Sequence, residues 1–463
     1  MEESFEIEIE SLNLDGRGIG QREDRKVFIA GALPEERVRY SLVKSKQQRE
    51  VGQLETLLRS SPDRVAPRCA HFGFFKGACG GCGLQHLDAT AQLAVKQQAL
   101  ETMLWQIAKV RPQTLLPPID GPIWGYRHRA RLSVRYVRRR DEVLVGFHER
   151  ARSFIADMQS CAILTERVSD LLMPLRMLIA GLSIRERLPQ IEVAVGDQAI
   201  VLVMRVLDPP SQADHEALLH FGRTHDVSIW LQPGGPDTVV PLDGNANVLS
   251  LSLPEFGVRL PFAPTDFTQV NHQLNSVLVG RAVELLAPQP GDVVVDFFCG
   301  LGNFTLPLAT RSQRVIGLEG STGLVARAEQ AALHNDLARR TVFTARDLFD
   351  WSAEDWTWLV DTYGVESQDA DKKNRIDRVL IDPPRAGALA VVQALADTRV
   401  PPKRLVYVSC NPETLARDTA ILVHEGGWQL RAAGVVNMFP HTAHVESIAM
   451  FEPPSYCHAA GVR

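Results

Sequence analysis

Three short segments of the sequence carry side chains that can act together as a nucleophile, a base and their charged partners. They are IDPPR, with Asp382 and Arg385, SCNP, with Cys410, and HVE, which ends at Glu446. Each lies at or near the end of a predicted strand, and open α/β sheets bind ligands outside the carboxyl ends of their strands. Cys410 lies between a strand and a helix, so we expect the helix N-terminus to lower the pKa of its thiol.

This combination suits the transfer of a methyl group to carbon. C5 of uracil is a poor nucleophile until another group adds to C6. Attack of the Cys410 thiolate at C6 gives an enolate, C5 then takes the methyl group, and a base such as Glu446 removes the C5 proton to expel the thiolate. Taken singly, each of these residues could have a purely structural role: Cys410 as a buried side chain, Glu446 as a surface residue and Asp382 as part of an Asp-Pro turn. Their joint placement at strand ends favours the chemical interpretation.

A glycine-rich turn indicates the methyl donor. The segment DFFCGLGNF places Asp296, Gly300 and Gly302 where a predicted strand passes into a helix, and glycine lets a nucleotide-like ligand approach the backbone there. Glu319 ends the next strand, at the position of a ribose partner, and Asp347 follows the third, where an adenine edge can be read. The third glycine of the dinucleotide fingerprint is absent, which favours S-adenosylmethionine (SAM) over NAD.

A second group of residues has the spacing of a thiolate site. Cys69, Cys79 and Cys82 lie close together in the sequence, and Cys161 follows much later. The two glycines between Cys79 and Cys82 let both thiolates turn toward one ion. Four thiolates suit either tetrahedral zinc or a [4Fe-4S] cluster, and the alternative is that these are buried apolar side chains. Cys457, in a polar tail, is expected to be a free surface thiol.

Two N-terminal blocks precede the segments that carry the chemistry. Residues 1–59 alternate period-two strands with turns and predict a five-stranded, OB-like antiparallel barrel. Residues 60–261 contain the cysteines, a predicted helix capped by Asp88, and nine arginines between Arg127 and Arg152 on predicted strands. Arginines interleaved with aromatic rings suit phosphates and bases of RNA or DNA, and the alternative is a solvated sheet face.

The C-terminal block, residues 262–463, alternates strands and helices. This pattern predicts a doubly wound parallel sheet, so the fold class is mixed: a β barrel, a central α+β domain and a Rossmann-like α/β domain. Residues 350–374 are acidic and without period, and we expect them to form a surface excursion.

The composition is that of a globular protein of about three domains. The chain has 463 residues, of which 45% are hydrophobic and 23% charged. No uncharged apolar run approaches the length of a membrane-spanning helix, and the acidic N-terminus lacks the basic region of a secretory signal, so we expect a cytoplasmic protein without a membrane partner. The net charge of -5 argues against a uniformly basic surface and leaves a local basic patch open.

The chain resembles the SAM-dependent RNA uracil-C5 methyltransferases over essentially its whole length. The segments DFTQVN, DFFCGLGNFTLPLA, DPPRAG, SCNP and HVES carry the resemblance. It implies that Cys410 is the nucleophile and Glu446 the proton acceptor. It also implies that six residues contact SAM or the target base: Gln269, Phe298, Asn303, Glu319, Asp347 and Asp382.

The N-terminal additions narrow the resemblance to one branch of that family. A TRAM-like barrel together with a cysteine cluster is similar to the bacterial members that methylate 23S ribosomal RNA, which implies this RNA as partner. In that branch the cluster is [4Fe-4S] and structural, which implies Cys69, Cys79, Cys82 and Cys161 as its ligands. We expect a monomer. The alternatives are methylation of another rRNA or tRNA uridine, N-methylation of an exocyclic amine, and a non-catalytic RNA-binding assembly factor.

Overall fold

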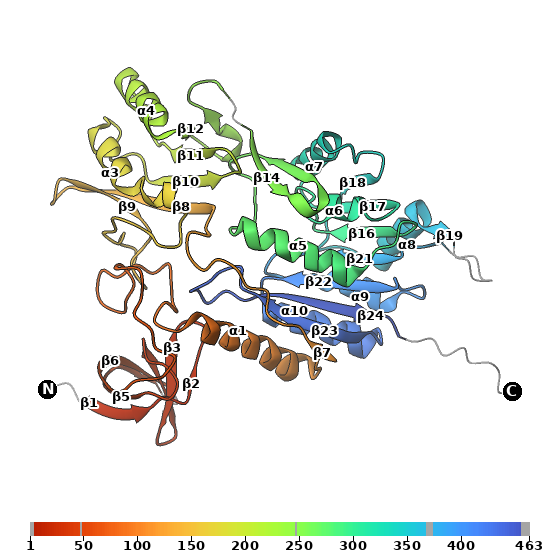
Figure 1. Ribbon diagram of the computed structural model, residues 1–463, viewed down its shortest axis with the longest axis horizontal. Helices are drawn as coiled ribbons and strands as arrows, with labels where there is room; N and C mark the ends of the chain where they lie inside the picture. Colours follow the sequence, from red (N-terminus) through yellow and green to blue (C-terminus); the bar gives the residue numbers. More distant parts are fainter. Residues whose placement is uncertain (1–3, 47–48, 246–247, 367–373, 455–463) are drawn as a thin grey trace.

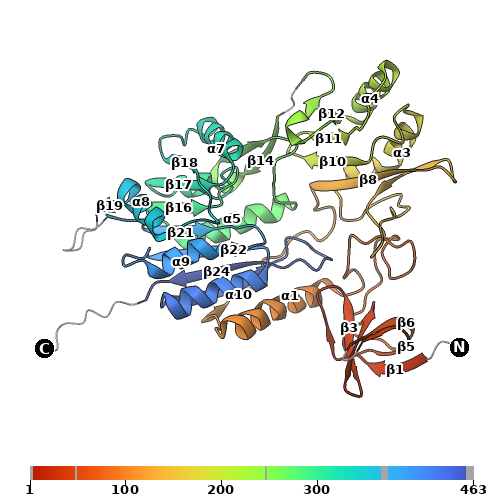
Figure 2. The same cartoon turned by 180° about the vertical axis from the view of Figure 1, so that it is seen from behind.

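The computed structural model describes residues 4–46, 49–245, 248–366 and 374–454, and Figures 1 and 2 show it from opposite sides. Cys457 lies outside the described residues. Three larger sheets follow one another along the chain, an N-terminal, a central and a C-terminal one. Among the helices in the described part, none has both the length and the apolar character needed to cross a membrane.

The N-terminal sheet is curled and consistent with a barrel (Figure 1). Its order is β1-β5-β6-β4-β3-β2, with β1 (Ser4–Glu8), β2 (Ser11–Leu12), β3 (Arg17–Arg22), β4 (Arg25–Ala30), β5 (Arg37–Lys46) and β6 (Arg49–Arg59). Period-two patterning turns Val27, Ile29, Val38 and Tyr40 into a small closed core. Six strands are present where the sequence predicts five, because the two-residue β2 pairs separately with β3.

This sheet meets the cysteine-rich segment at Gly16. The residue has φ +76°, and a Cβ added there would lie 2.3 Å from the carbonyl oxygen of Gly83. Only glycine combines this backbone conformation with so close an approach. The contact therefore seats the N-terminal sheet against the rest of the molecule.

Helix α1 (Ala89–Met103) lies in the predicted central block but packs on the C-terminal sheet (Figure 2). As expected, it begins after Asp88, whose carboxylate accepts a hydrogen bond from the Thr90 amide at 2.9 Å. The helix continues as a π-helical turn, η1 (Leu104–Ala108), and β7 (Thr114–Leu115) then joins the edge of the C-terminal sheet. The central and C-terminal blocks are thus interleaved, and their boundaries stay a prediction.

The central sheet has the order β13-β12-β11-β10-β8-β9 and is mostly antiparallel. Its strands are β8 (Arg129–Val137), β9 (Glu142–Gly146), β10 (Gln190–Val195), β11 (Ile200–Arg205), β12 (Ser228–Gln232) and β13 (Val240–Pro241). Helices α2 (Glu166–Ser169), α3 (Leu172–Gly181) and α4 (Gln212–His225) accompany it, and the β14–β15 hairpin (Leu249–Leu253, Val258–Phe262) leads to the C-terminal sheet.

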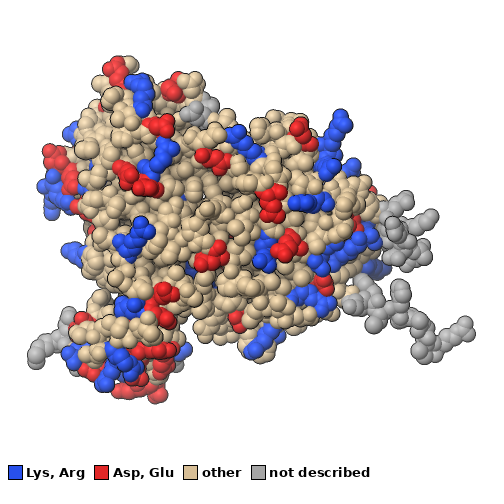
Figure 3. Space-filling view, viewed as in Figure 1, with Lys and Arg blue, Asp and Glu red and all other residues tan. Residues whose placement is uncertain are grey.

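Three of the nine arginines between Arg127 and Arg152 form ion pairs with acidic neighbours in the described part of the chain: Arg131, Arg138 and Arg140. Arg131 pairs with Glu192 at 2.8 Å, and Arg140 pairs with Asp157 at 2.7 Å. Basic and acidic side chains are correspondingly interspersed on the face seen in Figure 3. The interpretation of these strands as an RNA-binding face stays a prediction.

The C-terminal sheet is Rossmann-like, as the sequence predicts, with the order β18-β17-β16-β21-β22-β24-β23-β7. Its strands are β16 (Val293–Phe297), β17 (Arg314–Glu319), β18 (Thr341–Ala345), β21 (Arg378–Ile381), β22 (Arg404–Ser409), β23 (Gln429–Val436) and β24 (Glu446–Glu452). The strands from β18 to β22 are parallel, whereas β24 runs antiparallel to β22. The run Val293–Phe297 is buried throughout, as expected for a strand covered on both faces.

Helices cover both faces of this sheet (Figures 1 and 2). Apolar side chains on one face pack against α5 (His272–Leu286), α6 (Thr305–Ala309) and α7 (Thr322–His334). Those on the other face pack against α1, α8 (Ala353–Tyr363), α9 (Leu389–Asp397) and α10 (Pro412–Ala420). The prediction that residues 350–374 form a surface excursion without regular structure is wrong for α8. This helix begins at a capping box formed by Ser352, and its side chains Trp356 and Leu359 are buried.

We expect Gly16→Ala to destabilise the protein by about 1–3 kcal/mol, because alanine is strained at this φ and its Cβ meets the Gly83 carbonyl. Urea unfolding measures the effect. Gly235→Ala is the matched control: Gly235 has φ -69° and no atom within 4 Å of an added Cβ. It should change the unfolding free energy by less than about 0.5 kcal/mol. Equal effects of the two variants would contradict this account of the contact.

Candidate active site

The carboxyl ends of the parallel strands surround one cavity of about 530 Å³, which we call the catalytic cavity. It lies at the switch point of the sheet, where β16 has β17 on one side and β21 on the other. Eight residues singled out in the sequence line it: Gln269, Phe298, Asn303, Glu319, Asp347, Asp382, Cys410 and Glu446. The fold therefore gathers them, while their individual roles stay predictions.

The glycine-rich turn and Glu319 hold each other in place. Phe298, directly after β16, has φ 63°, an uncommon conformation for a bulky residue, and Gly300 has φ 54°. One carboxylate oxygen of Glu319 accepts a hydrogen bond from the Gly300 amide at 3.1 Å, and the other accepts one from the Ser321 amide at 3.0 Å. A Cβ on Gly300 would meet no atom within 4 Å, so the turn is open to a ligand.

An aromatic residue that the sequence analysis missed forms part of the wall. The ring of Phe349 lies 5.8 Å from that of Phe298 at 60°, and it is 58% exposed. The Phe349 amide donates to the Asp347 carboxylate at 2.9 Å. The position of Phe349 two residues after Asp347, the residue predicted to contact adenine, could have indicated this role. An exposed aromatic ring beside a nucleotide site can stack on a base.

Two amide side chains of the predicted set differ in their surroundings. Asn303 forms a reciprocal pair of hydrogen bonds with Asn275 of α5, at 2.9 and 3.0 Å, so its side chain is already held. Asn275 is buried and was not expected from the sequence. Gln269 makes no side-chain hydrogen bond to the described residues, and it lines the cavity.

Strand pairing brings the nucleophile and the base together. Cys410 directly follows β22, Glu446 begins β24, and the antiparallel register pairs Ser409 with Ser447. One further step along both strands places Cys410 beside Glu446. Burial raises the pKa of Glu446 to about 8, with the nearby Asp382 as a second cause. Burial likewise raises the pKa of Asp382 to about 7.

The structure contradicts the expected lowering of the Cys410 pKa. Burial raises the pKa of this thiol to about 11, and the Glu446 and Asp382 carboxyls add to the increase, while Arg385 opposes it. The helix N-terminus has little to offer in return: Pro412 has no N–H, and the Glu413 amide donates to the Asn411 side chain at 3.1 Å. Free Cys410 is therefore a protonated thiol at neutral pH.

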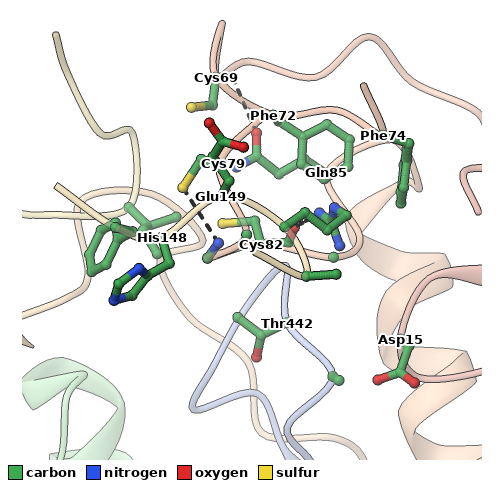
Figure 4. Close-up of a pocket in the computed structure, with 18 of the residues that line it drawn as sticks. Asp15, Cys69, Phe72, Phe74, Cys79, Cys82, Gln85, His148, Glu149 and Thr442 are labelled. Atoms are coloured by element: carbon green, nitrogen blue, oxygen red, sulfur yellow. Dashed lines mark hydrogen bonds between the residues drawn. The ribbon is translucent and has the colours of Figure 1, made fainter. Parts of the chain in front are cut away.

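The clustered cysteines line a second cavity of about 660 Å³, which we call the cysteine cavity. Cys69, Cys79, Cys82 and Cys161 all contribute, although nine residues separate the first two. Figure 4 shows the sulfur atoms of Cys69, Cys79 and Cys82 around one region, with Thr442 of the C-terminal half nearby. Burial raises the pKa of Cys82 to about 12 and that of Cys161 to about 11. Within the described residues, no group of three His, Cys, Asp or Glu side chains is arranged to hold a metal ion.

Comparison with known proteins decides the family. The model of the tRNA (uracil-5-)-methyltransferase family matches residues 88–453. The chain belongs to the tRNA (uracil-5-)-methyltransferase family. A 23S rRNA (uracil(1939)-C(5))-methyltransferase RlmD of Bordetella avium is 53% identical over 96% of this chain and 90% of its own length. One of the same name from Cupriavidus pinatubonensis is 52% identical over 96% and 95%.

A solved structure shares the fold of this methyltransferase. The tRNA (uracil-54, C5)-methyltransferase of Pyrococcus abyssi, solved in complex with S-adenosyl-L-homocysteine, matches with a TM-score of 0.70. It is 23% identical and covers 96% of this chain and all of its own. At this identity the likeness supports the architecture described above.

We expect the methyltransferase to lose stability as the pH rises toward 8.5. The raised pKa values, about 8 for Glu446 and about 7 for Asp382, mean that the folded protein holds protons that the unfolded chain releases at lower pH. Their stabilising contribution is complete below the unfolded pKa values of about 4 and is lost as the pH rises through 7 to 8.

Urea unfolding at about pH 6 and about pH 8.5 measures this dependence. Glu446→Gln, which cannot titrate, should show a smaller loss than the unsubstituted protein. A protein that is equally stable at both pH values would contradict the assigned shifts.

Proposed function

We propose that the protein transfers a methyl group from SAM to C5 of a uridine in 23S ribosomal RNA, through a covalent bond between Cys410 and C6. The catalytic cavity carries the proposal, because it joins a thiol, two carboxyls and an open glycine-rich turn. The names of relatives that are more than half identical over 96% of the chain support 23S ribosomal RNA as the substrate.

Cys410 begins the reaction by adding to C6 of a uracil that has been turned out of its stack. The sulfur–C6 bond forms, and the electrons of the C5–C6 bond move toward the carbonyl oxygen at C4 as an enolate. Because the pKa of the free thiol is about 11, a carboxylate must take its proton as the sulfur adds. Glu446 and Asp382 are the carboxyls beside it.

SAM supplies the methyl group: the C5–methyl bond forms as the bond between the SAM sulfur and the methyl carbon breaks, and S-adenosyl-L-homocysteine is left. Glu446 then takes the C5 proton, the C5–C6 double bond reforms, and the sulfur–C6 bond breaks to return the thiolate. A pKa of about 8 suits a base that must gain and lose a proton near neutral pH. The cavity thus offers two carboxyls for two protons, one from the thiol and one from C5.

The other lining residues suit the binding of SAM and of the base. The turn at Gly300 is open to a nucleoside, Glu319 can accept ribose hydroxyls, and Asp347 can accept from an adenine amino group. Gln269, Phe298, Asn303 and Asp382 would contact SAM or the uracil.

RNA carrying 5-fluorouridine at the target should form an SDS-stable adduct with the protein, because Glu446 cannot remove fluorine from C5. Cys410→Ala should abolish both the adduct and methyl transfer. Glu446→Gln should still form the adduct with ordinary RNA and accumulate it, with turnover reduced by about a hundredfold or more. Denaturing gels and methyl incorporation measure these outcomes.

Two results would decide for the alternatives. Normal methyl transfer by Cys410→Ala would favour N-methylation, which needs no thiol. Neither adduct nor methylation would favour an assembly factor. Mapping 5-methyluridine in 23S rRNA and tRNA, from cells with and without the protein, distinguishes the RNA substrates. We also propose that the protein acts in the cytoplasm and that it is a monomer. Sedimentation of the purified protein tests its oligomeric state.

We further propose that Cys69, Cys79, Cys82 and Cys161 hold a [4Fe-4S] cluster. Four cysteines line one cavity, and four thiolates are the number that such a cluster takes. The cavity of about 660 Å³ has more room than a single ion needs, and the side chains would have to turn toward the cluster to bind it. Burial disfavours the thiolates that such a site requires, and bound iron would reverse that preference. The cluster would link the segment of Cys69, Cys79 and Cys82 to that of Cys161, and it would take no part in the methyl transfer.

Anaerobically purified protein should be brown and contain iron and acid-labile sulfide. Cys79→Ala should lose both, whereas Cys299→Ala should keep them, because Cys299 is buried away from the cysteine cavity. Metal analysis and the visible absorption spectrum measure this. Stoichiometric zinc without sulfide would sink the assignment.

A further inference from the structure

The loop between β23 and β24, residues 437–445, forms a wall common to the two cavities. Phe439 and His444 line the catalytic cavity, and Thr442 and His444 line the cysteine cavity. The rings of Phe439 and His444 lie 5.1 Å apart, and His444 Nδ1 lies 3.2 Å from Arg385 Nη2. This loop therefore shapes the space next to Cys410, where the uracil must fit.

Residues of the central block, 60–261, form hydrogen bonds to the backbone of this loop. The amides of Gly83 and Leu84, directly after CGGC, donate to the carbonyl oxygen of His441 at 2.8 and 3.0 Å. The Tyr126 hydroxyl donates to the Pro440 carbonyl oxygen at 3.0 Å. The cysteine segment and the loop are thus joined by direct backbone hydrogen bonds.

Two polar side chains of α1 complete the attachment. Gln92 Oε1 accepts from the His441 amide at 2.9 Å, and its Nε2 lies 3.1 Å from His441 Nδ1. The Lys96 ammonium donates to Asn437 Oδ1 at 3.0 Å and to the Phe439 carbonyl oxygen at 2.8 Å. Lys96 is completely buried, and a buried ammonium is costly unless such hydrogen bonds are kept. These contacts therefore select one conformation of the loop.

The selected conformation is a strained one. His441 has φ 65°, in the left-handed region, and its ring stacks on Trp124 with centroids 4.0 Å apart. Such a conformation persists only where the surroundings impose it. The amides of Gly83 and Leu84 bind the His441 carbonyl oxygen, and Gln92 binds the His441 amide, so this residue is held at both its backbone groups. These hydrogen bonds impose the left-handed conformation, and they set the direction in which the chain continues to His444.

We propose that Gln92 and Lys96 are positioning residues for the target uracil: with the cysteine segment they hold the 437–445 loop as one wall of the base pocket. Through this loop, the group bound by the cysteines supports the catalytic cavity without touching the substrate. The inference rests on the proposed function for the identity of the base, and on the proposed cluster for the bound group.

The kinetic test uses the iron-loaded protein with Gln92→Ala and Lys96→Met. We expect the KM for RNA to rise about tenfold in each variant, because the loop is no longer held as a wall of the base pocket, and adduct formation with 5-fluorouridine RNA to slow. The affinity for SAM should stay within about twofold, because the hydrogen bonds that hold the turn after β16 go to Glu319, Leu318 and Asn275 and not to the loop. Gln98→Ala, on the exposed side of the same helix, is the matched control and should match the unsubstituted protein. A general loss of structure would lower SAM affinity as well.

Hydrogen exchange supplies a measurement that needs no activity. Amides of residues 437–445 should exchange faster in iron-loaded Gln92→Ala and in Cys79→Ala, with exchange in β16 and β17 unchanged. Unchanged exchange and an unchanged KM for RNA in Gln92→Ala would overturn the proposal, even if Cys79→Ala fails to fold. If the exchange responds but no RNA is methylated, the proposed function fails while the coupling through the loop stands.

Discussion

The chemistry of this protein depends on one strand that runs against its neighbour. Parallel strands bring only their carboxyl ends to the ligand edge, and Cys410 follows such an end. Because β24 is antiparallel to β22, its first residue, Glu446, reaches the same edge beside the thiol. A parallel strand of its seven residues would place that carboxyl at the opposite edge, about 20 Å away.

The same arrangement sets the electrostatics of the site. Burial is the main cause of the raised pKa values of Asp382, Glu446 and Cys410. Asp382 adds to the increase at Glu446, and both carboxyls add to it at Cys410, whereas Arg385 opposes the increase at both. A protonated thiol beside carboxyls with pKa values near 7 and 8 favours a reaction in which protons move together with the bonds. In the free protein the nucleophile Cys410 is therefore a protonated thiol, which is less reactive than the thiolate.

Helix caps, buried strands and turns could be predicted from the sequence because they depend on residues that are close together in the chain. Asp88 caps α1, the apolar run Val293–Phe297 forms a buried parallel strand, and the glycines after it make an open turn. Helix α8 was missed although its capping residues are local, because the acidic composition around it outweighed them. The contacts of Gln92 and Lys96 with the 437–445 loop could not be predicted either, because His441 and Asn437 lie more than three hundred residues away from them in the chain.

By itself, the sequence determined the kinds of groups present: a thiol, carboxyls, a nucleoside-binding turn, and three clustered cysteines with a fourth much later in the chain. It also determined the Rossmann-like order of the elements in the C-terminal block. Only the tertiary structure decided the direction of the Cys410 pKa, since burial and the approach of Glu446 and Asp382 outweigh the helix end. It also decided that the cysteine cavity and the catalytic cavity share a wall at His444. Both outcomes depend on distances between residues far apart in sequence, which local pattern and spacing do not contain.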